Sequence, residues 1–371
     1  MAEIMRGTHL LRSMAVLGSL FLFVGASASL ELKTNLTKAL VPLSEIISGG
    51  PPPDGIPAID RPRFVTPKEA DRWLDPREPV LSVSLSGDAR AYPLQILLWH
   101  EIVNDAVGGK PVAVTYCPLC NSGIVFDRTI NGKVYDFGTS GKLYKSDLVM
   151  YDRQTSSLWA QMEGRAIVGD LAGTTLAVLP ANTLAYGDWK AFFSGGKVLS
   201  RETGHSRDYG RNPYDSYDAP QSRPFLFSGP VDRRLPPKER VVGVSVGGVA
   251  RAYPFSLLAK KTVVHDVLDR ERLVVFFRSG TLSALDRSLI TASRDVGTTV
   301  VFSAVVAGRP LTFEPDPAGF RDRETGSFWT FLGLAVQGAL AGRSLRRVPH
   351  VDAFWFAWAA FHPSTSVFEK D

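Results

Sequence analysis

Apolar and polar residues alternate along much of the chain, in short stretches separated by turn residues. One stretch, 82–93 (SVSLSGDARAYP), alternates around a Gly-Asp pair, and another, 124–138 (IVFDRTINGKVYDFG), does so around Asn131-Gly132. A period of two places successive side chains on opposite faces of a strand, and Asn-Gly is a favoured two-residue turn between antiparallel strands. Both stretches therefore predict β-hairpins.

Two short stretches are predicted to be helical. The first, 93–101 (PLQILLWHE), opens with a proline, which is well tolerated at the first position of a helix. The second, 182–193 (NTLAYGDWKAFF), lies about ninety residues further on. Because most of the remaining patterned stretches predict strands, the expected fold class is α+β and β-rich, built from antiparallel units.

Two parts of the chain resemble each other. Residues 89–93 and 250–254 both have the sequence ARAYP, and 112–116 (VAVTY) aligns with 273–277 (LVVFF) at the same offset. With small gaps the correspondence continues through Asp152-Arg153 and Asp322-Arg323, Trp159 and Trp329, and Trp189 and Trp358. Ordered matches of this kind indicate an internal repeat. We expect two tandem copies of one antiparallel unit, packed as a pseudo-twofold body.

The repeat divides the chain into five predicted segments. They are a leader at 1–28, a loop-like segment at 29–79, a first repeat unit at 80–200, a polar connector at 201–240 and a degenerate second unit at 241–368. We expect features shared by both units to be scaffold. Features found in one unit only are candidates for site chemistry.

The leader has the three parts of a secretory signal. Arg6 and Arg12 precede the apolar stretch 14–25 (MAVLGSLFLFVG), and small residues follow at 26–28. We expect cleavage and export to the periplasm or the extracellular space. The alternative is an uncleaved anchor, which would then provide the protein's membrane contact.

Composition indicates a globular protein. Hydrophobic residues make up 44% of the chain and charged residues 21%, which is enough to bury a core. The net charge of +5 is scattered, so a solvated mixed surface is favoured over nucleic-acid binding. The expected partner is instead a small molecule or a metal-delivery protein.

The strongest chemical signal is a Cys-x-x-Cys motif. Cys117 and Cys120 are the only cysteines in the chain, and the aligned stretch of the second unit (RSGTLS) has neither. Three interpretations stay open: a metal site, a thiol–disulfide redox couple, or a passive local pair. A disulfide across so short a loop stabilises little, so stapling of the fold is a poor reason for the pair.

The metal hypothesis adds His100 as a third ligand. The run from Glu101 to Tyr116 is expected to form a hairpin that returns the chain toward His100, and two thiolates with an imidazole suit copper or zinc. Glu101 is then a group that orients a ligand or relays protons. The redox hypothesis makes Cys117 the attacking thiol and Cys120 the resolving one, although antiparallel flanks differ from the βαβ context of thioredoxins.

A polar stretch near the cysteines supplies further candidates. Its residues and those around the motif are expected to line a pocket: Asn104, Asn121, Ser140, Lys142, Ser146, Asp147, Asp152, Gln154 and Trp159. The connector, with its tyrosines, is expected to wrap the surface, with a lid over the site as the alternative. A third function class is a non-catalytic binding module that uses the connector and the Ser/Lys loop.

Four long motifs resemble one known family. YPLQILLWHEIVND, VTYCPLCNSGIVFDR, FGTSGKLYKSDLVMYDRQTSSLWAQ and FWFAWAAFHPST are similar to the domain-of-unknown-function family 3179, over about 61–368. The resemblance implies an exported or membrane-associated prokaryotic-type protein and no particular reaction. It carries over to His100, Glu101, Asn104, Cys117, Cys120, Ser140, Gly141, Lys142, Ser146, Asp147, Asp152, Gln154 and Trp159, and so strengthens a shared site around Cys117.

Overall fold

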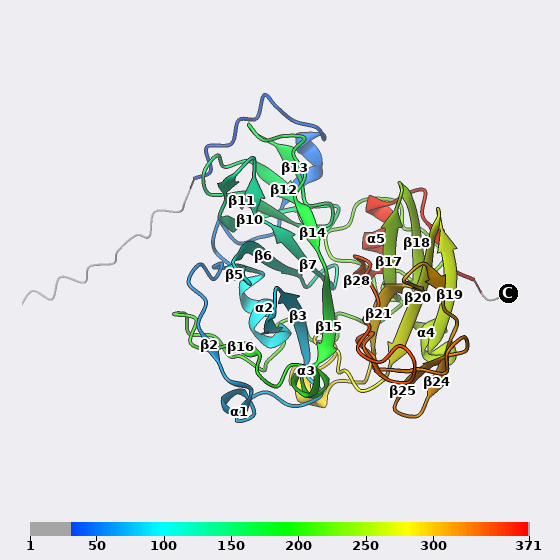
Figure 1. Cartoon of the computed structure of the whole chain (residues 1–371). Coiled ribbons are helices and arrows are strands. Elements are labelled where there is room, and N and C mark those ends of the chain that lie inside the picture. The colour runs from blue at the N-terminus through cyan, green and yellow to red at the C-terminus, as the bar shows by residue number, and fades with distance from the viewer. Residues whose placement is uncertain (1–30, 370–371) are drawn as a thin grey trace, which may run out of the picture.

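The structure, a computed structural model, describes residues 31–369 (Figure 1). The predicted leader at 1–28 lies outside the described residues. Among residues 31–369, no helix is both long enough and apolar enough to cross a membrane. The fold is β-rich, as predicted, with short helices between the strands.

The first half of the chain forms three antiparallel or mixed sheets. In spatial order, the first contains β1 (Ile46–Ser48), β10 (Phe137–Tyr144), β11 (Asp147–Asp152), β12 (Leu158–Ala160) and β13 (Arg165–Val168). The second contains β14 (Ala177–Leu179), β7 (Ser122–Asp127), β6 (Lys110–Cys117) and β5 (Ile102–Val107). The third contains β15 (Ala181–Ala185), β3 (Pro79–Leu85), β4 (Asp88–Pro93), β16 (Lys197–Leu199) and β2 (Phe64–Val65).

The second half of the chain contains three more sheets. The first contains β28 (Val351–Phe354), β17 (Arg240–Val246), β18 (Val249–Pro254) and β29 (Ser366–Val367). The second contains β19 (Val263–Leu268), β20 (Glu271–Arg278) and β21 (Thr298–Ser303). The third contains β24 (Phe313–Asp316), β25 (Gly319–Asp322), β26 (Phe328–Trp329) and β27 (Ala335–Gln337). Two small ribbons are β8 (Thr129–Ile130) with β9 (Lys133–Val134), and β22 (Val305–Val306) with β23 (Arg309–Pro310).

The helices of the described chain are all short. The α-helices are α1 (Pro67–Ala70), α2 (Leu94–His100), α3 (Tyr186–Phe192), α4 (Phe255–Lys261) and α5 (Trp355–Phe361). Single 3-10 turns, η1 and η2, span Leu43–Glu45 and Ile290–Ala292. The prediction of a helix over 93–101 is confirmed by α2. The prediction over 182–193 is correct only from Tyr186, because the residues before it pair with β3 as strand β15.

Both predicted hairpin turns form, one of them a residue earlier than expected. Asn131 (φ 49) and Gly132 (φ 78) join β8 to β9 in the left-handed region that a two-residue hairpin turn requires. In the other hairpin Leu85 faces Asp88 across the strands, so the turn is Ser86-Gly87 rather than Gly-Asp.

The same order of elements occurs in both halves. A hairpin, a helix and a second hairpin follow one another as β3, β4, α2, β5 and β6, and again as β17, β18, α4, β19 and β20. An Arg-Tyr-Asp cluster also occurs in each half: the Tyr92 hydroxyl donates to Asp105 at 2.6 Å, and the Tyr253 hydroxyl donates to Asp266 at 2.7 Å. These residues are scaffold, as expected for shared features. The pseudo-twofold relation between the halves stays a prediction.

The two halves pack directly against each other. Strand β28 lies beside β7, and β15 lies beside β21, along the boundary between the green and orange parts of Figure 1. The large apolar cluster that contains both cysteines also includes α5 from the second half. The environment of the cysteines is therefore built by both halves of the chain.

Candidate functional site

The two cysteines lie at the hairpin turn between β6 and β7. Cys117 is the last residue of β6 and faces Ser122 across the turn, and Cys120 lies inside it. Asn121 adopts a left-handed conformation (φ 53), and its N–H donates to the Pro118 carbonyl at 3.3 Å. The chain after Cys117 is thus a tight turn and not a helix, so no helix dipole acts on either thiol.

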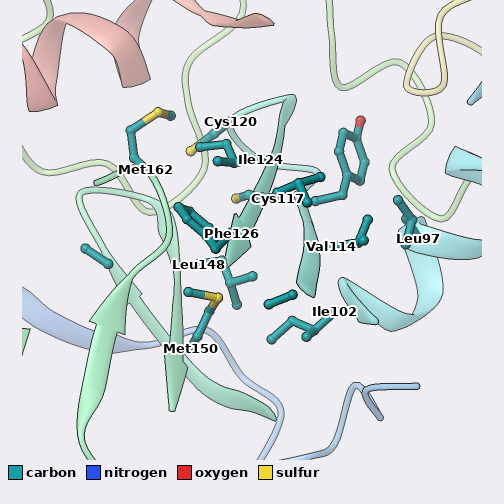
Figure 2. Packing of buried hydrophobic residues seen from close by; sticks show 14 of the residues in the cluster. Leu97, Ile102, Val114, Cys117, Cys120, Ile124, Phe126, Leu148, Met150 and Met162 are labelled. Atoms are coloured by element: carbon teal, nitrogen blue, oxygen red, sulfur yellow. The ribbon is translucent and has the colours of Figure 1, made fainter. Parts of the chain in front are cut away.

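A second hairpin turn brings a carboxylate to the cysteines. Lys145 (φ 53) and Ser146 (φ 65) join β10 to β11, and Asp147 is the first residue of β11. One ligating atom from each of Cys117, Cys120 and Asp147 lies within 4.8 Å of the others, and all three residues are buried. Both cysteines are free thiols. The two sulfur atoms lie among apolar side chains such as Leu148 and Ile124 (Figure 2).

One oxygen of Asp147 has no protein partner. Its Oδ2 accepts a hydrogen bond from the Met162 N–H at 2.9 Å. Its Oδ1 is buried without a hydrogen-bond partner among residues 31–369. The Cys120 thiol has a long contact of 3.6 Å to the Ser146 carbonyl. The S–H groups of Cys120 and Cys117 are only weak donors to the Asp147 carboxyl. A buried acceptor without a strong donor is costly, so the cluster as it stands lacks a positive charge beside this oxygen.

Burial shifts the protonation of all three groups. It raises the pKa of the Cys117 thiol and raises the pKa of Cys120 well above its ordinary value. It also raises the pKa of Asp147 to about 7, against the opposing effect of the Met162 N–H. Desolvation penalises the charged form of each group. A cation would reverse this preference, because it stabilises the thiolates and the carboxylate directly.

Glu101 is brought toward the cysteines by the β5–β6 hairpin. Its carbonyl accepts from the Tyr116 N–H at 2.8 Å, so the backbone of Glu101 lies opposite the residue before Cys117. Glu101 ends α2 in a left-handed conformation (φ 56). Burial, with the nearby charge of Asp147, raises the pKa of its carboxyl to about 8.

His100 does not join the cluster. Its Nδ1 lies 2.7 Å from the Pro57 carbonyl and its Nε2 lies 2.7 Å from the Tyr209 hydroxyl, so both ring nitrogens have hydrogen-bond partners elsewhere. The group of potential ligands contains Asp147 in the place where His100 was expected. The predicted return of the chain is correct, but the reversal at Glu101 turns the neighbouring side chains in different directions. Burial lowers the pKa of His100 to about 4, consistent with a neutral ring that links α2 to the connector.

A cavity of about 230 Å³ adjoins the cluster. Its wall includes Glu101, Leu119, which lies between the two cysteines, and Leu148, which follows Asp147. The other lining residues are Gly49, Pro51, Ile56, Thr139, Gly141, Lys142, Leu143, Tyr214, Tyr217 and Phe225. The cavity is therefore closed by the predicted loop-like segment on one side and by the connector on another.

Of the remaining predicted pocket residues, Lys142 lines this cavity. Several others hold the scaffold: Asn104 bonds to Asp60 and Phe137, Ser146 to the Phe225 carbonyl, Gln154 to the Asp136 N–H, and Asp152 to Thr155 and Trp159. Asn121 accepts from the Tyr116 hydroxyl at 3.2 Å, and Ser140 donates to the Val149 carbonyl. These contacts stabilise turns and strands around the site.

The connector contributes residues that the sequence did not single out individually. Tyr214, Tyr217 and Phe225 lie on the cavity wall, whereas the sequence predicts only a surface wrap, a lid or a binding surface for the connector as a whole. The signal available in the sequence was the density of tyrosines in 201–218. Which of them face the site depends on how an irregular segment packs, and no periodic pattern reports that.

Comparison with known proteins gives one match. No curated protein and no solved structure matches the chain. The model of one family, described as protein of unknown function (DUF3179), matches residues 53–365, which is most of the chain. The match includes the cysteine turn, Asp147 and the greater part of the cavity wall. The chain therefore belongs to the DUF3179 family.

Proposed function

We propose that this protein binds a transition-metal ion through Cys117, Cys120 and Asp147. The observation that carries the proposal is the buried Oδ1 of Asp147, which has no partner among the described residues and lies beside two buried free thiols. Two thiolates and a carboxylate give three donors, one fewer than the usual four of zinc. A water molecule would supply the fourth.

Zinc fits this donor set better than copper(I). Zinc accepts thiolate sulfur and carboxylate oxygen together, whereas copper(I) prefers soft sulfur ligands. Asp147 is the hard member of the set, and its position at the start of β11 fixes it next to the soft pair. With three protein donors the site resembles catalytic rather than structural zinc sites in its coordination number.

The same geometry argues against a thiol–disulfide oxidoreductase. An attacking thiol needs a lowered pKa and access to its partner. Here both thiols are at most 1% exposed and their pKa values are raised. A disulfide between Cys117 and Cys120 in the native protein would nevertheless favour the oxidoreductase, and a thiol titration detects such a bond.

We further infer that the chain is a duplicated unit and that only the first copy kept the metal site. The shared order of elements and the matched Arg-Tyr-Asp clusters support the duplication. In the second copy Arg278 ends β20 at the position that corresponds to Cys117.

Export, which we infer from the sequence of 1–28, would place the site in an oxidising compartment where a bound metal protects the thiols. Fractionation of the producing cells and the mass of the mature chain test the export.

The metal content of the purified full-length protein tests the proposal. Wild type loaded with zinc(II) or with copper(I) under reducing conditions is dialysed and analysed by elemental mass spectrometry. We expect about one zinc per chain. Cys117→Ser and Asp147→Asn should each weaken zinc binding at least tenfold, because each removes a ligand.

His100→Gln is the matched control. It changes a buried polar residue close to the cysteines in sequence but outside the ligand group, so it should retain zinc. The proposal is wrong if wild type binds no metal, or if Asp147→Asn retains zinc while His100→Gln loses it. A thiol titration that finds Cys117 and Cys120 already joined would move the assignment to the oxidoreductase.

A further inference from the structure

The cavity beside the proposed metal site contains two polar groups that the protein does not satisfy. Glu101 is only 8% exposed, and its carboxyl has no hydrogen bond or ion pair within the described chain. The Tyr214 hydroxyl, on the same wall, likewise has no hydrogen-bond partner among residues 31–369. A buried carboxyl without a partner is costly, which points to a bound molecule as its partner.

Most of the rest of the wall is apolar or aromatic, with Lys142 and Thr139 as its other polar side chains. Leu119, Leu143, Leu148, Tyr217 and Phe225 face the cavity from three different segments. An apolar wall with a few convergent polar groups is typical of small-molecule sites. The apolar wall favours a mostly apolar ligand, and the Glu101 carboxyl requires that this ligand has one polar group to hydrogen-bond with it.

The size of the cavity limits that molecule. Its volume is about 230 Å³. A dry engineered cavity of about 150 Å³ holds a benzene molecule, so this one accommodates a single ring or a short alkyl chain with one substituent. It is too small for a nucleotide or a peptide.

We propose that the cavity binds a small, largely apolar alcohol whose hydroxyl group lies against Glu101 and Tyr214. A hydroxyl both donates and accepts hydrogen bonds, so it satisfies the carboxyl in either protonation state and the phenol at the same time. An apolar molecule without a hydroxyl would leave the carboxyl unsatisfied.

The position of the cavity connects this ligand to the proposed metal. Leu119 lies between the two cysteines and Leu148 follows Asp147, so the ligand is separated from the cluster by little more than these side chains. Binding of the alcohol stands on the cavity alone. Any reaction of the bound alcohol rests on the proposed function, because the metal site would be the reactive group beside the cavity.

Binding of benzyl alcohol to the zinc-loaded full-length protein tests the inference. Toluene and benzoate serve as probes of matched size, and saturation-transfer NMR with calorimetry measures the affinities. We expect saturable binding of benzyl alcohol and about tenfold weaker binding of toluene, because toluene leaves the carboxyl unpaired. Glu101→Leu should weaken benzyl alcohol about tenfold, and Glu101→Gln, which keeps a donor and an acceptor, should restore it.

Tyr214→Phe is a second variant, which serves as the test if Glu101→Leu fails to fold. It removes one hydroxyl and preserves the ring. It should weaken benzyl alcohol several-fold and leave toluene unchanged. Equal affinity for toluene and benzyl alcohol, or no binding of either, overturns the inference. Tighter binding of benzoate also overturns it, in favour of an anion site at Lys142. Zinc content is measured on the same samples, so that a failure of alcohol binding is distinguished from a failure of zinc binding.

Discussion

The N–H of Phe354 donates a hydrogen bond to the carbonyl of Cys120 at 2.8 Å. Phe354 ends β28 in the second half of the chain, and Cys120 lies in the turn that holds both thiols in the first half. Its ring is fully buried and lies 6.2 Å from the ring of Tyr217, which lines the cavity. The second half of the chain is thus a structural support of the site.

Phe354→Ala tests this support. The substitution removes a buried ring and should destabilise the protein by roughly 3–5 kcal/mol. Alanine keeps the backbone N–H that bonds to Cys120, but the ring that packs β28 against Tyr217 and the cysteine turn is lost, so zinc binding should also weaken several-fold. Phe302→Ala is the control: this ring is equally buried but lies in a separate core cluster, so the variant should lose comparable stability and retain zinc affinity. Urea unfolding and zinc titration measure both quantities, and equal zinc affinities in the two variants would contradict the support.

Gly141 determines how the loop-like segment closes the cavity. It lies in a β-bulge of β10 with φ +70, and a Cβ built there would lie 2.0 Å from the Pro51 carbonyl oxygen. Gly141→Ala should therefore destabilise the protein by roughly 2–5 kcal/mol and detach residues 49–56, which limited proteolysis detects. Gly132→Ala has a similar φ of +78 with open space around it, so it should cost only about 1–2 kcal/mol. Equal losses in the two variants would show that the contact with Pro51 is unimportant.

The stability of the metal-free protein should fall as the pH rises from about 4.5 to about 8, between the pKa values of the Asp147 and Glu101 carboxyls in the unfolded and the folded state. Burial raises the pKa of Asp147 to about 7 and that of Glu101 to about 8, so the folded state retains protons there that the unfolded state has released. Folding is favoured while both carboxyls stay protonated, and this contribution is lost as the pH rises through the folded pKa values. Urea unfolding of chelator-treated protein measures the slope.

Two comparisons isolate the origin of this slope. Asp147→Asn cannot ionise at this position, so its stability should depend less on pH in the same range, by up to about 1.4 kcal/mol per pH unit. Zinc should remove the part of the loss in wild type that comes from Asp147, because the ion stabilises the charged carboxylate. An identical slope in wild type and Asp147→Asn would refute the raised pKa of this residue.

Asp152 and Asp322 are expected to be scaffold residues in the two halves. The Asp152 carboxylate accepts from Trp159 Nε1 at 3.0 Å, and the Asp322 carboxylate accepts from Trp329 Nε1 at 2.8 Å. Asp152→Ala and Asp322→Ala should each destabilise the protein by roughly 2–4 kcal/mol, because a buried indole N–H loses its acceptor. Neither should change zinc content. If Asp152→Ala alone lost zinc, Asp152 would belong to the site, as first predicted from the sequence.

Local chemistry in the sequence determined the hairpins, the helix α2 and the turn at Asn131-Gly132, because side-chain period and turn residues act over a few neighbours. It also determined that the cysteines lie at a strand end and that the chain from Glu101 returns beside them. These features require no knowledge of distant contacts.

Only the tertiary structure decided which side chains meet. Asp147 reaches the thiols because two hairpin turns from different sheets pack together, and no spacing in the sequence encodes that contact. The left-handed conformation of Glu101 directs it to the cavity while His100 points to Pro57 and Tyr209. Ligand identity depends on side-chain direction within a residue or two, and that direction is set by packing between elements far apart in the chain.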